Sequence, residues 1–527
     1  MSTATETTAT TGSGLSAPRA ATRSRALPSW WPLVALTVLA AALRLSTLGL
    51  QSFWFDEAFT PVHVLRPSLF TTLHSLTRTE NSPPLWYVVE WVFYRLFGSG
   101  EWALRMPSAL AGIALVPVAW GIGRELAGRA VATGTAALVA VGPIFVWYSQ
   151  EARVYGLYAF ASGVLVLCFI RLLNRPRERG ALVAFAVAGA FALLTHYFTA
   201  FLLVGMTAWI FWRGETRRRC VPALAAVGFV GLALIPLISA QGGRNTNWIG
   251  AWPLSNRLAA IPQYFLTGYN GALGHAIELL VALPLLAACA LGIWRLSEPA
   301  PAGAPRGFAA WAGASPASEE DRYRRAAAVS LWLAACGIGI PLLLALGGAD
   351  YLAPRNVIGA FVPTAALLAV LATWPRTWPY GAVLLALGVA GLLAIAIDVD
   401  LSPRLQRADW RGLARLIPPG GPERAYTTVL LGSAPLQHYI PGLVKLPRHR
   451  AVAVRELVET GERPLKQGAG RPPSGFALAE RHEVHGLVAY RFVASVPRTL
   501  SEEQLRHYVP DRAEPWVLVP EDARNSR

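Results

Sequence analysis

Residues 30–60 read WWPLVALTVLAAALRLSTLGLQSFWFDEAFT, an apolar run that ends near two adjacent carboxylates, Asp56 and Glu57. A membrane-spanning helix needs roughly 20 predominantly apolar residues, and this run approaches that length. A carboxylate beside an apolar region costs desolvation free energy unless it is paired or serves a function. The stretch therefore predicts a membrane helix with a candidate functional site where the chain leaves the membrane.

The composition of the whole chain is typical of a polytopic membrane protein. Of the 527 residues, 54% are hydrophobic and only 15% are charged, unlike an ordinary soluble domain. The formal net charge of +16 comes mainly from arginines in short loops between apolar runs. Such loops usually face the cytoplasm, so the charge indicates topology and we expect no nucleic-acid partner. The excess of Arg over Lys suggests a GC-rich bacterial genome, so we expect a multi-pass protein of the bacterial plasma membrane.

Arginine-rich segments divide the chain into membrane crossings. They lie before Trp30, at Arg124 and Arg129, and at Arg171–Arg179, Arg213–Arg219, Arg295–Arg325 and Arg376. If each segment faces the cytoplasm, the chain crosses the membrane about eleven times. The last crossing, 379–397, then ends outside. The expected fold class is an all-α polytopic membrane domain of about 11 transmembrane helices plus juxtamembrane helices, with a small mixed α/β extracytoplasmic C-terminal domain.

Two apolar stretches do not fit a simple crossing. The stretch 84–97 holds roughly 14 residues, too few to span comfortably, so we expect an interfacial or re-entrant helix there. The run 181–212 carries His196 near its middle and arginines at both ends, which predicts a short hairpin. The outward loops would then be 51–102, 149–154, the His196 turn, 241–273 and 348–355, all on one face.

The expected domain organisation has three parts. These are a disordered cytoplasmic tail over 1–27, a transmembrane catalytic domain over 28–398 with a cytoplasmic linker at 297–325, and an extracytoplasmic domain over 399–527. Beyond residue 400 the hydropathy drops. Short strand-like runs then occur at Tyr426–Leu431 and Gly486–Ala494.

The outward loops carry groups suited to acid–base chemistry and to phosphate binding. The candidates are Asp56, Glu57, Glu151, Arg153, Tyr155, His196, Tyr197 and Arg355. A carboxylate at the membrane surface can accept the proton of an incoming hydroxyl, and a guanidinium can hold the oxygens of a departing phosphate. This combination suits the transfer of a group from a lipid phosphate, with the active site facing outside.

Each of these groups also has a purely structural interpretation. Asp56 and Glu57 are acidic residues that would suit the start of a helix, and Glu151 and Arg153 can pair with each other. His196 can be a hydrogen-bonded turn residue. Arg44 and Arg355 can extend toward the interface, and Pro83-Pro84 can fix a helix start.

Taken in order, these motifs resemble the C-type (GT-C) superfamily of integral-membrane glycosyltransferases, in particular the branch of protein O-mannosyltransferases and aminoarabinose transferases. The resemblance covers roughly the first half of the chain. It rests on Arg44 in the first helix and on the segments Trp54–Glu57, Pro83–Leu85, Gly98–Arg105 and Gln150–Tyr155. His196-Tyr197 and the junction Asp398–Trp410 fit more loosely.

The resemblance implies a reaction and a set of roles. Asp56 would be the general base, Glu57 a supporting carboxylate, and Glu151 and Arg153 would line the sugar and phosphate. The donor would be a polyprenyl-phosphate sugar, with mannose as the guess, and transfer to a hydroxyl of a protein, glycan or lipid would invert the anomeric centre. No obligatory metal is expected, although a divalent cation is an alternative within the superfamily.

Two positions depart from the family pattern. Asn81-Ser82 stands where relatives often have His or Lys before the paired prolines, so no phosphate-binding role is assigned there. Arg355 is followed by Asn356, where many relatives have an Arg-Tyr pair. Two other function classes stay open: a transporter or flippase of lipid-linked sugar, which usually shows internal repeats and charges near the midplane, and a non-catalytic membrane subunit.

Overall fold

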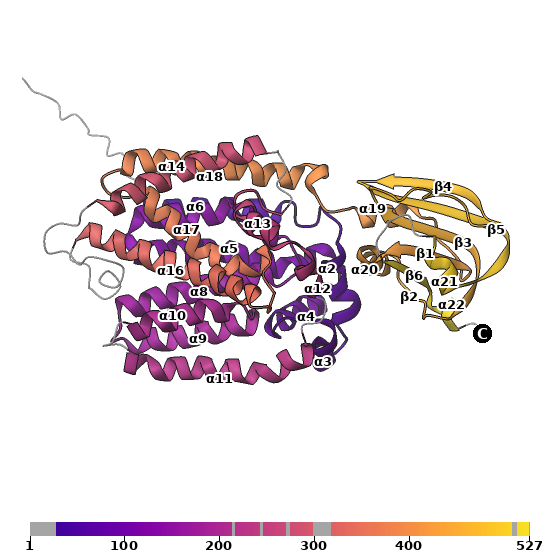
Figure 1. The fold of residues 1–527 in the computed structure, drawn as a ribbon, viewed down its shortest axis with the longest axis horizontal. Helices are drawn as coiled ribbons and strands as arrows, with labels where there is room; N and C mark the ends of the chain where they lie inside the picture. The colour runs from indigo at the N-terminus through magenta and orange to yellow at the C-terminus, as the bar shows by residue number, and fades with distance from the viewer. Residues whose placement is uncertain are drawn as a thin grey trace, which may run out of the picture.

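The chain forms a helical part and a C-terminal sheet part that lie end to end in the computed structural model (Figure 1). The structure describes residues 28–212, 217–242, 246–269, 275–298, 318–508 and 514–525. The tail expected over 1–27 lies outside the described residues.

The helical part is built from apolar helices, most of them long, that run roughly along the long axis of the molecule (Figure 1). In chain order they are α1 (Trp31–Leu45), α5 (Glu101–Ala127), α6 (Arg129–Val141), α7 (Pro143–Ser149), α8 (Tyr155–Asn174), α9 (Arg179–Thr195), α10 (Thr199–Trp212), α11 (Arg217–Gln241), α14 (His275–Ser297), α16 (Glu319–Leu346), α17 (Ile358–Ala372) and α18 (Trp378–Leu401).

Within the described residues, seven helices are long and apolar enough to cross a membrane. The count rises to eight if α6 and α7, which are bent by 53° at their break, form one span. Helices α1, α9 and α10 are apolar but shorter. A multi-pass membrane protein is therefore supported, while the number eleven stays a prediction.

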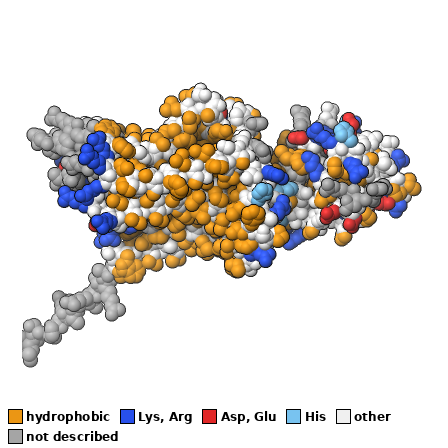
Figure 2. All heavy atoms as spheres, turned by 90° about the horizontal axis from the view of Figure 1, so that it is seen from below, with side chains coloured by type: hydrophobic (Ala, Val, Ile, Leu, Met, Phe, Trp, Pro, Cys, Tyr) orange, Lys and Arg blue, Asp and Glu red, His pale blue; other side chains and the backbone are white. Residues whose placement is uncertain are grey.

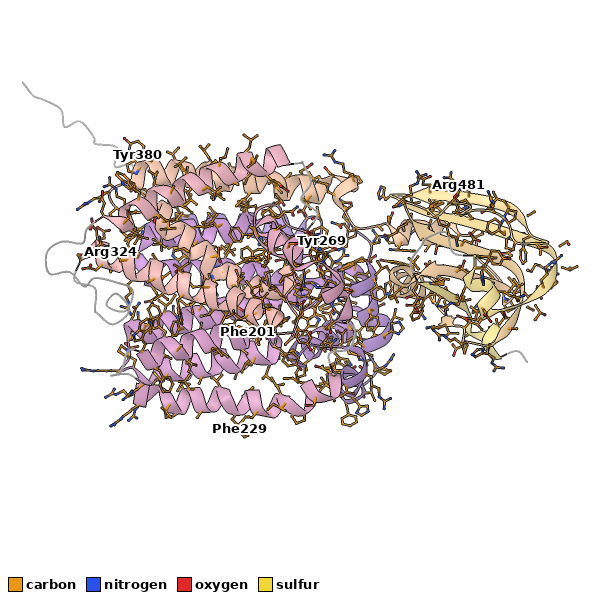
Figure 3. The ribbon with its side chains drawn as sticks, in the orientation of Figure 1. Phe201, Phe229, Tyr269, Arg324, Tyr380 and Arg481 are labelled. Atoms are coloured by element: carbon orange, nitrogen blue, oxygen red, sulfur yellow. The ribbon has the colours of Figure 1, made fainter. Side chains whose placement is uncertain are left out.

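A broad apolar belt covers the helical part, as a bilayer-embedded surface requires (Figure 2). Phe229, on α11, points away from the bundle and is 72% exposed (Figure 3). Lys and Arg side chains gather at the end of the belt farthest from the sheet part (Figure 2). The basic side chains at this end fit the positive charge expected of cytoplasmic loops.

Short helices cluster at the opposite end of the bundle, facing the sheet part (Figure 1). They include α2 (Phe55–Phe59), the π-helical turn η1 (Thr60–Val64), α3 (Leu69–Thr79), α4 (Leu85–Phe97) and α12 (Asn247–Ala251). Pro84 occupies the N-cap position directly before α4, which confirms the expected helix start. Two further elements, α13 (Leu254–Thr267) and the 3₁₀ turn η2 (Pro354–Val357), contact each other.

Some boundaries match the sequence expectations and others do not. The predicted hairpin is confirmed, because α9 ends at Thr195 and α10 begins at Thr199. Of the linker expected over 297–325, residues 299–317 lie outside the described part. Residues 319–325 are helical instead, since the Ser318 hydroxyl caps α16 and the Asp321 side chain completes the capping box. The final long helix continues to Leu401.

The C-terminal part contains one six-stranded sheet with the order β2-β6-β1-β3-β5-β4. The strands are β1 (Arg424–Val429), β2 (Leu443–Lys445), β3 (Ala451–Glu462), β4 (Ala477–Val484), β5 (Leu487–Ser501) and β6 (Pro515–Pro520), and the helices are α19 (Trp410–Leu416), α20 (Leu430–Tyr439), α21 (Glu502–Arg506) and α22 (Glu521–Asn525). Strands β1 and β3 are parallel, and the other pairs are antiparallel. The expected mixed α/β character is confirmed.

Candidate functional site

Asp56 and Arg355 meet although 299 residues separate them in the chain. Asp56 lies in the first turn of α2, and Arg355 lies in η2 just before α17. Arg355 Nη1 donates to Asp56 Oδ2 at 2.7 Å, and the two side chains are 20% and 21% exposed, respectively. The loops 51–102 and 348–355, which are expected to face outward, therefore converge, and their ion pair is partly exposed to solvent.

Aromatic rings surround the Arg355 guanidinium. Its central carbon lies 4.8 Å from the Trp248 ring centre and 5.6 Å from that of Tyr155. Cations over aromatic faces are stabilised by the ring quadrupole. Arg355 is thus held within the site, and the simple alternative that it extends freely toward the interface is wrong.

Glu57 points away from Asp56 into the protein and is fully buried. Both of its oxygens accept from Arg105, with Nε and Nη2 each at 2.7 Å, and Oε1 also accepts from the Ala152 backbone N–H at 2.8 Å. Burial would raise the pKa of Glu57, but the charges of Arg105 and Arg407 outweigh burial and lower it. All of these contacts are internal, and they fix the backbone that carries Asp56.

Arg153 connects the backbone of Asp56 to Thr60 and Glu80. Its two terminal nitrogens donate to the Glu80 carboxylate at 3.0 and 3.2 Å, and Nη1 also reaches the Thr60 hydroxyl at 3.2 Å. A longer contact of 3.4 Å joins Nη1 to the carbonyl oxygen of Asp56. The alternative that Glu151 and Arg153 pair with each other is therefore wrong.

Glu151 pairs with a residue from beyond the last long helix. Arg407 Nη2 donates to Glu151 Oε2 at 3.1 Å, while Oε1 is buried with no hydrogen-bond partner among the described residues. Burial raises the pKa of this carboxyl to about 7, although the charge of Arg407 acts against the increase. The charge of Arg407 therefore favours the ionised form of Glu151 against the effect of burial.

His196 lies in the turn between α9 and α10 and stacks on Tyr158, with ring centres 4.2 Å apart. The Tyr155 ring centre lies 6.2 Å away. The Nδ1 atom of His196 accepts from the Phe198 backbone N–H at 3.2 Å. This confirms the interpretation of His196 as a hydrogen-bonded turn residue. Burial and then the charge of Arg355 lower the pKa of His196 to about 3, and the ring is neutral at physiological pH. The neighbouring Tyr197 hydroxyl donates to Gln241 Oε1 at 2.9 Å.

Arg44 does not extend to the interface as expected. Its side chain is fully buried and donates to the carbonyl oxygens of Ala140 at 2.8 Å and Val139 at 3.1 Å. Its Nε also reaches the Ser149 hydroxyl at 3.1 Å. The guanidinium thus satisfies backbone groups at the bend between α6 and α7, which explains a charge inside an apolar helix.

The sequence interpretation assigned no role to three residues that organise the site, namely Glu80, Arg105 and Arg407. Arg105 and Arg407 lie inside segments that resembled the family, and Glu80 lies just before the paired prolines. Their position in or beside these segments was the only feature of the sequence that pointed to a role, because their ion-pair partners are remote in sequence. Among the described residues, no three side chains of His, Cys, Asp or Glu form a metal-binding group. Independence from metal stays a prediction.

Comparisons with known proteins bear on the helical part. Residues 81–239 match the family model described as dolichyl-phosphate-mannose-protein mannosyltransferase. Among curated proteins, no significant match is found.

Solved structures of two kinds resemble the chain. The oligosaccharyltransferase of Archaeoglobus fulgidus with a tethered acceptor peptide aligns at 12% identity and a TM-score of 0.47, over 73% of this chain and 56% of the archaeal one. The chain thus spans little more than half the length of that relative. ArnT from Cupriavidus metallidurans bound to undecaprenyl phosphate aligns at 14% identity and a TM-score of 0.40, over 89% of this chain and 99% of ArnT.

The matched family segment contains α4 through most of α11, and with them Arg105, Glu151 and Arg153. This match agrees with the order of motifs along the chain and with a helical multi-pass architecture. Residues 81–239 are therefore similar to this mannosyltransferase family, and membership of the whole chain in the C-type superfamily of integral-membrane glycosyltransferases stays a prediction.

Proposed function

We propose that this protein transfers a sugar, with mannose as the working assignment, from polyprenyl phosphate to a hydroxyl group on the outer face of a bacterial plasma membrane. The observation that carries the proposal is the partly exposed Asp56–Arg355 pair, which brings a proton acceptor and a phosphate-binding cation together at 2.7 Å. The family model supports both mannose and a lipid-phosphate donor.

The reaction is a single displacement at the anomeric carbon. The acceptor oxygen forms a bond to that carbon and gives its proton to the Asp56 carboxylate. The bond between the anomeric carbon and the phosphate oxygen breaks, and the electron pair leaves with polyprenyl phosphate. Attack opposite the leaving group inverts the anomeric configuration. Arg355 would stabilise the negative charge that grows on the phosphate.

The ion pair also suggests how donor binding prepares the base. Arg355 donates to Asp56 Oδ2 in the structure, so this carboxylate oxygen is already engaged before the donor binds. A donor phosphate offers oxygens to the same guanidinium and would draw it away from Asp56. The base would therefore become free when the phosphate is in place.

Aromatic residues near the pair provide a surface for a sugar ring. Tyr269 stacks on Trp147 with ring centres 5.8 Å apart, and it lies at the end of the bundle that faces the sheet part (Figure 3). Trp54 and Tyr264 also approach Tyr269, at 6.4 and 5.5 Å between ring centres. We assign this cluster, together with Glu151 and Tyr155, to sugar binding.

The acceptor would approach from the side of the C-terminal part, where secreted protein, cell-wall glycan and lipid are all candidates. The remaining predicted contacts, by Glu57, Arg153, His196 and Tyr197, would support the site from within, because their described contacts are internal. In this proposal membrane lipids surround the apolar belt, and the chemical step needs no metal.

The proposal is tested by complementing a deletion strain and analysing its cell-envelope glycosides by mass spectrometry. The chain with Asp56→Asn should reach the membrane in normal amounts and leave the missing glycoside absent. The matched control Asp522→Asn alters an exposed carboxylate in α22 and should restore the glycoside. A glycoside restored by Asp56→Asn would refute Asp56 as the base. Transport of lipid-linked sugar by purified protein without glycoside formation would favour a flippase.

A further inference from the structure

The segment that follows α18 turns back onto the first outward loop. It contains the 3₁₀ turn η3 (Pro403–Leu405) and continues into α19. The Arg407 backbone N–H donates to Gln51 Oε1 at 3.1 Å. The Ser52 hydroxyl donates to the Ala408 carbonyl at 2.8 Å and accepts from the Trp410 backbone N–H at 3.1 Å. These bonds fix the segment beside Gln51 and Ser52, a few residues before Asp56.

The Arg407 side chain enters the site from this segment and is only 4% exposed. It pairs with Glu151 at 3.1 Å, and its Nε lies 3.7 Å from Glu57 Oε2. The guanidinium carbon lies 4.2 Å from the Trp147 ring centre. A residue outside the long helices thus supplies a buried cation between two carboxylates of the candidate site.

The two carboxylates depend on Arg407 to different extents. Glu57 already accepts both hydrogen bonds of a bidentate pair with Arg105. Among the described residues, Arg407 is the only ion-pair partner of Glu151, whose second oxygen is buried without a hydrogen bond. A buried carboxylate without a cation is strongly disfavoured and takes up a proton instead. Arg407 is therefore decisive for the charge of Glu151.

The number of positive and negative charges at the site also indicates that Glu151 depends on Arg407. The cations Arg105, Arg153, Arg355 and Arg407 face the carboxylates Glu57, Glu80, Asp56 and Glu151, one for one. Removing Arg407 leaves one carboxylate without a cation, and Glu151 would take up a proton to restore the balance.

We infer that Arg407 is a positioning residue that keeps Glu151 ionised and in place next to the Asp56–Arg355 pair, so that the segment leading into the C-terminal part completes the active site. This inference rests on the proposed function. It gives that segment a role in sugar transfer itself, separate from any role in acceptor choice.

The test compares Arg407→Gln with Arg411→Gln in the full-length protein. Arg411 follows Arg407 in the same segment. It donates to the carbonyl oxygens of Gly49 and Leu50 and to the Glu101 carboxylate. It is a matched control because its described contacts do not include Glu151. Thermal unfolding of each variant shows whether it is folded.

Arg407→Gln should reduce sugar transfer at neutral pH by about tenfold or more and shift the ionisation that limits activity toward higher pH. Besides Arg407, the charged groups that act on the ionisation of Glu151 are Glu57, Asp56 and Arg355. Arg407→Lys should restore part of the activity, whereas Arg411→Gln should keep the wild-type pH profile. Adding Arg407→Gln to Glu151→Gln should cause little further loss, because both changes act through one carboxylate.

A readout that does not need activity separates this inference from the proposed function. In infrared spectra at neutral pH, Arg407→Gln should increase the protonated-carboxyl signal that disappears with Glu151→Gln. An increase in Arg407→Gln, together with no sugar transfer by the wild-type protein, would support the inference about Glu151 while refuting the proposed function. No increase in a folded Arg407→Gln variant, or the same change in Arg411→Gln, would overturn the inference.

Discussion

Buried arginines at the candidate site are each matched to a specific acceptor. Arg105 is bonded to Glu57 through two nitrogens, and Arg44 is satisfied by carbonyl oxygens and a hydroxyl. Removing one partner from a buried ion pair typically costs about 3–5 kcal/mol, because the remaining charge stays buried. These residues therefore set the shape of the site, whereas the more exposed Asp56 and Arg355 are available for chemistry.

Space around Arg44 allows a prediction for a single residue. A Cβ added at Gly112, on α5, would lie 1.9 Å from the Ser149 hydroxyl oxygen and 2.9 Å from Arg44 Nε. Gly112→Ala should therefore destabilise the protein by about 1–3 kcal/mol, seen as a lower melting temperature in detergent. At Gly180, at the start of α9, a Cβ meets nothing within 4 Å. Equal melting temperatures for Gly112→Ala and Gly180→Ala would contradict this packing.

At the scale of elements, a second ion pair holds the loop that delivers Arg355. Arg257, on α13, is 2% exposed and donates to both oxygens of Asp350 at 2.6 Å. Its Nη1 also donates to the Leu352 carbonyl at 2.9 Å. Hydrogen bonds from Arg257 are the largest cause of a lowered pKa at Asp350. Stability from this contact is present above the ordinary pKa of the carboxyl and is lost as pH falls.

Asp350→Asn should therefore loosen the loop and misplace Arg355. We expect a loss of about tenfold in sugar transfer with a higher apparent KM for the donor, because small displacements at a reacting centre are costly. Steady-state kinetics with varied donor concentration measure this effect. The control Asp522→Asn should leave both constants unchanged. Unchanged kinetics in Asp350→Asn would show that the pair does not position Arg355.

The elements were more predictable from the sequence than the contacts between them. Apolar length predicted the long helices, Pro83-Pro84 predicted the start of α4, and the position of His196 predicted the hairpin. Side-chain pairing was not predictable, because Arg355 and Arg407 lie 299 and 256 residues from their carboxylate partners. Arg44 was misassigned, because the tendency of arginine to extend toward the interface does not account for carbonyl oxygens supplied by a bent neighbouring helix.

At the scale of the whole molecule, the C-terminal part is anchored to the loop that carries Asp56. The Tyr439 hydroxyl accepts from the Phe53 backbone N–H at 2.6 Å and donates to Glu101 Oε1 at 2.7 Å. Arg407 and Trp410 add contacts to the same loop. The two parts meet where the site lies (Figure 1), so changes in the sheet part can reach the site through this contact.

The stability of the whole chain should depend on the pH through Glu459 in β3, which is 3% exposed. Burial raises the pKa of this carboxyl from 4.5 to about 8, although Lys466 and the Gly470 backbone N–H act against the increase. Between these values the folded state holds a proton that the unfolded state has lost. Stability should therefore fall as the pH rises through this window.

Glu459→Gln removes this titration. The melting temperature of the full-length variant should fall less between pH 5 and pH 9 than that of the wild type. Glu483→Gln, which alters a more exposed carboxylate on β4, serves as the control. Parallel curves for the wild type and Glu459→Gln would contradict the role of this buried carboxyl.

The central claim is that Asp56 accepts a proton from a hydroxyl while polyprenyl phosphate leaves. Its most direct measurement is the rate at which purified protein in liposomes releases polyprenyl phosphate from polyprenyl-phosphate mannose, with cell-envelope extract as the acceptor. The account predicts acceptor-dependent release by the wild type and a rate lower by at least about a hundredfold for Asp56→Asn. Release by Asp56→Asn at the wild-type rate would contradict it.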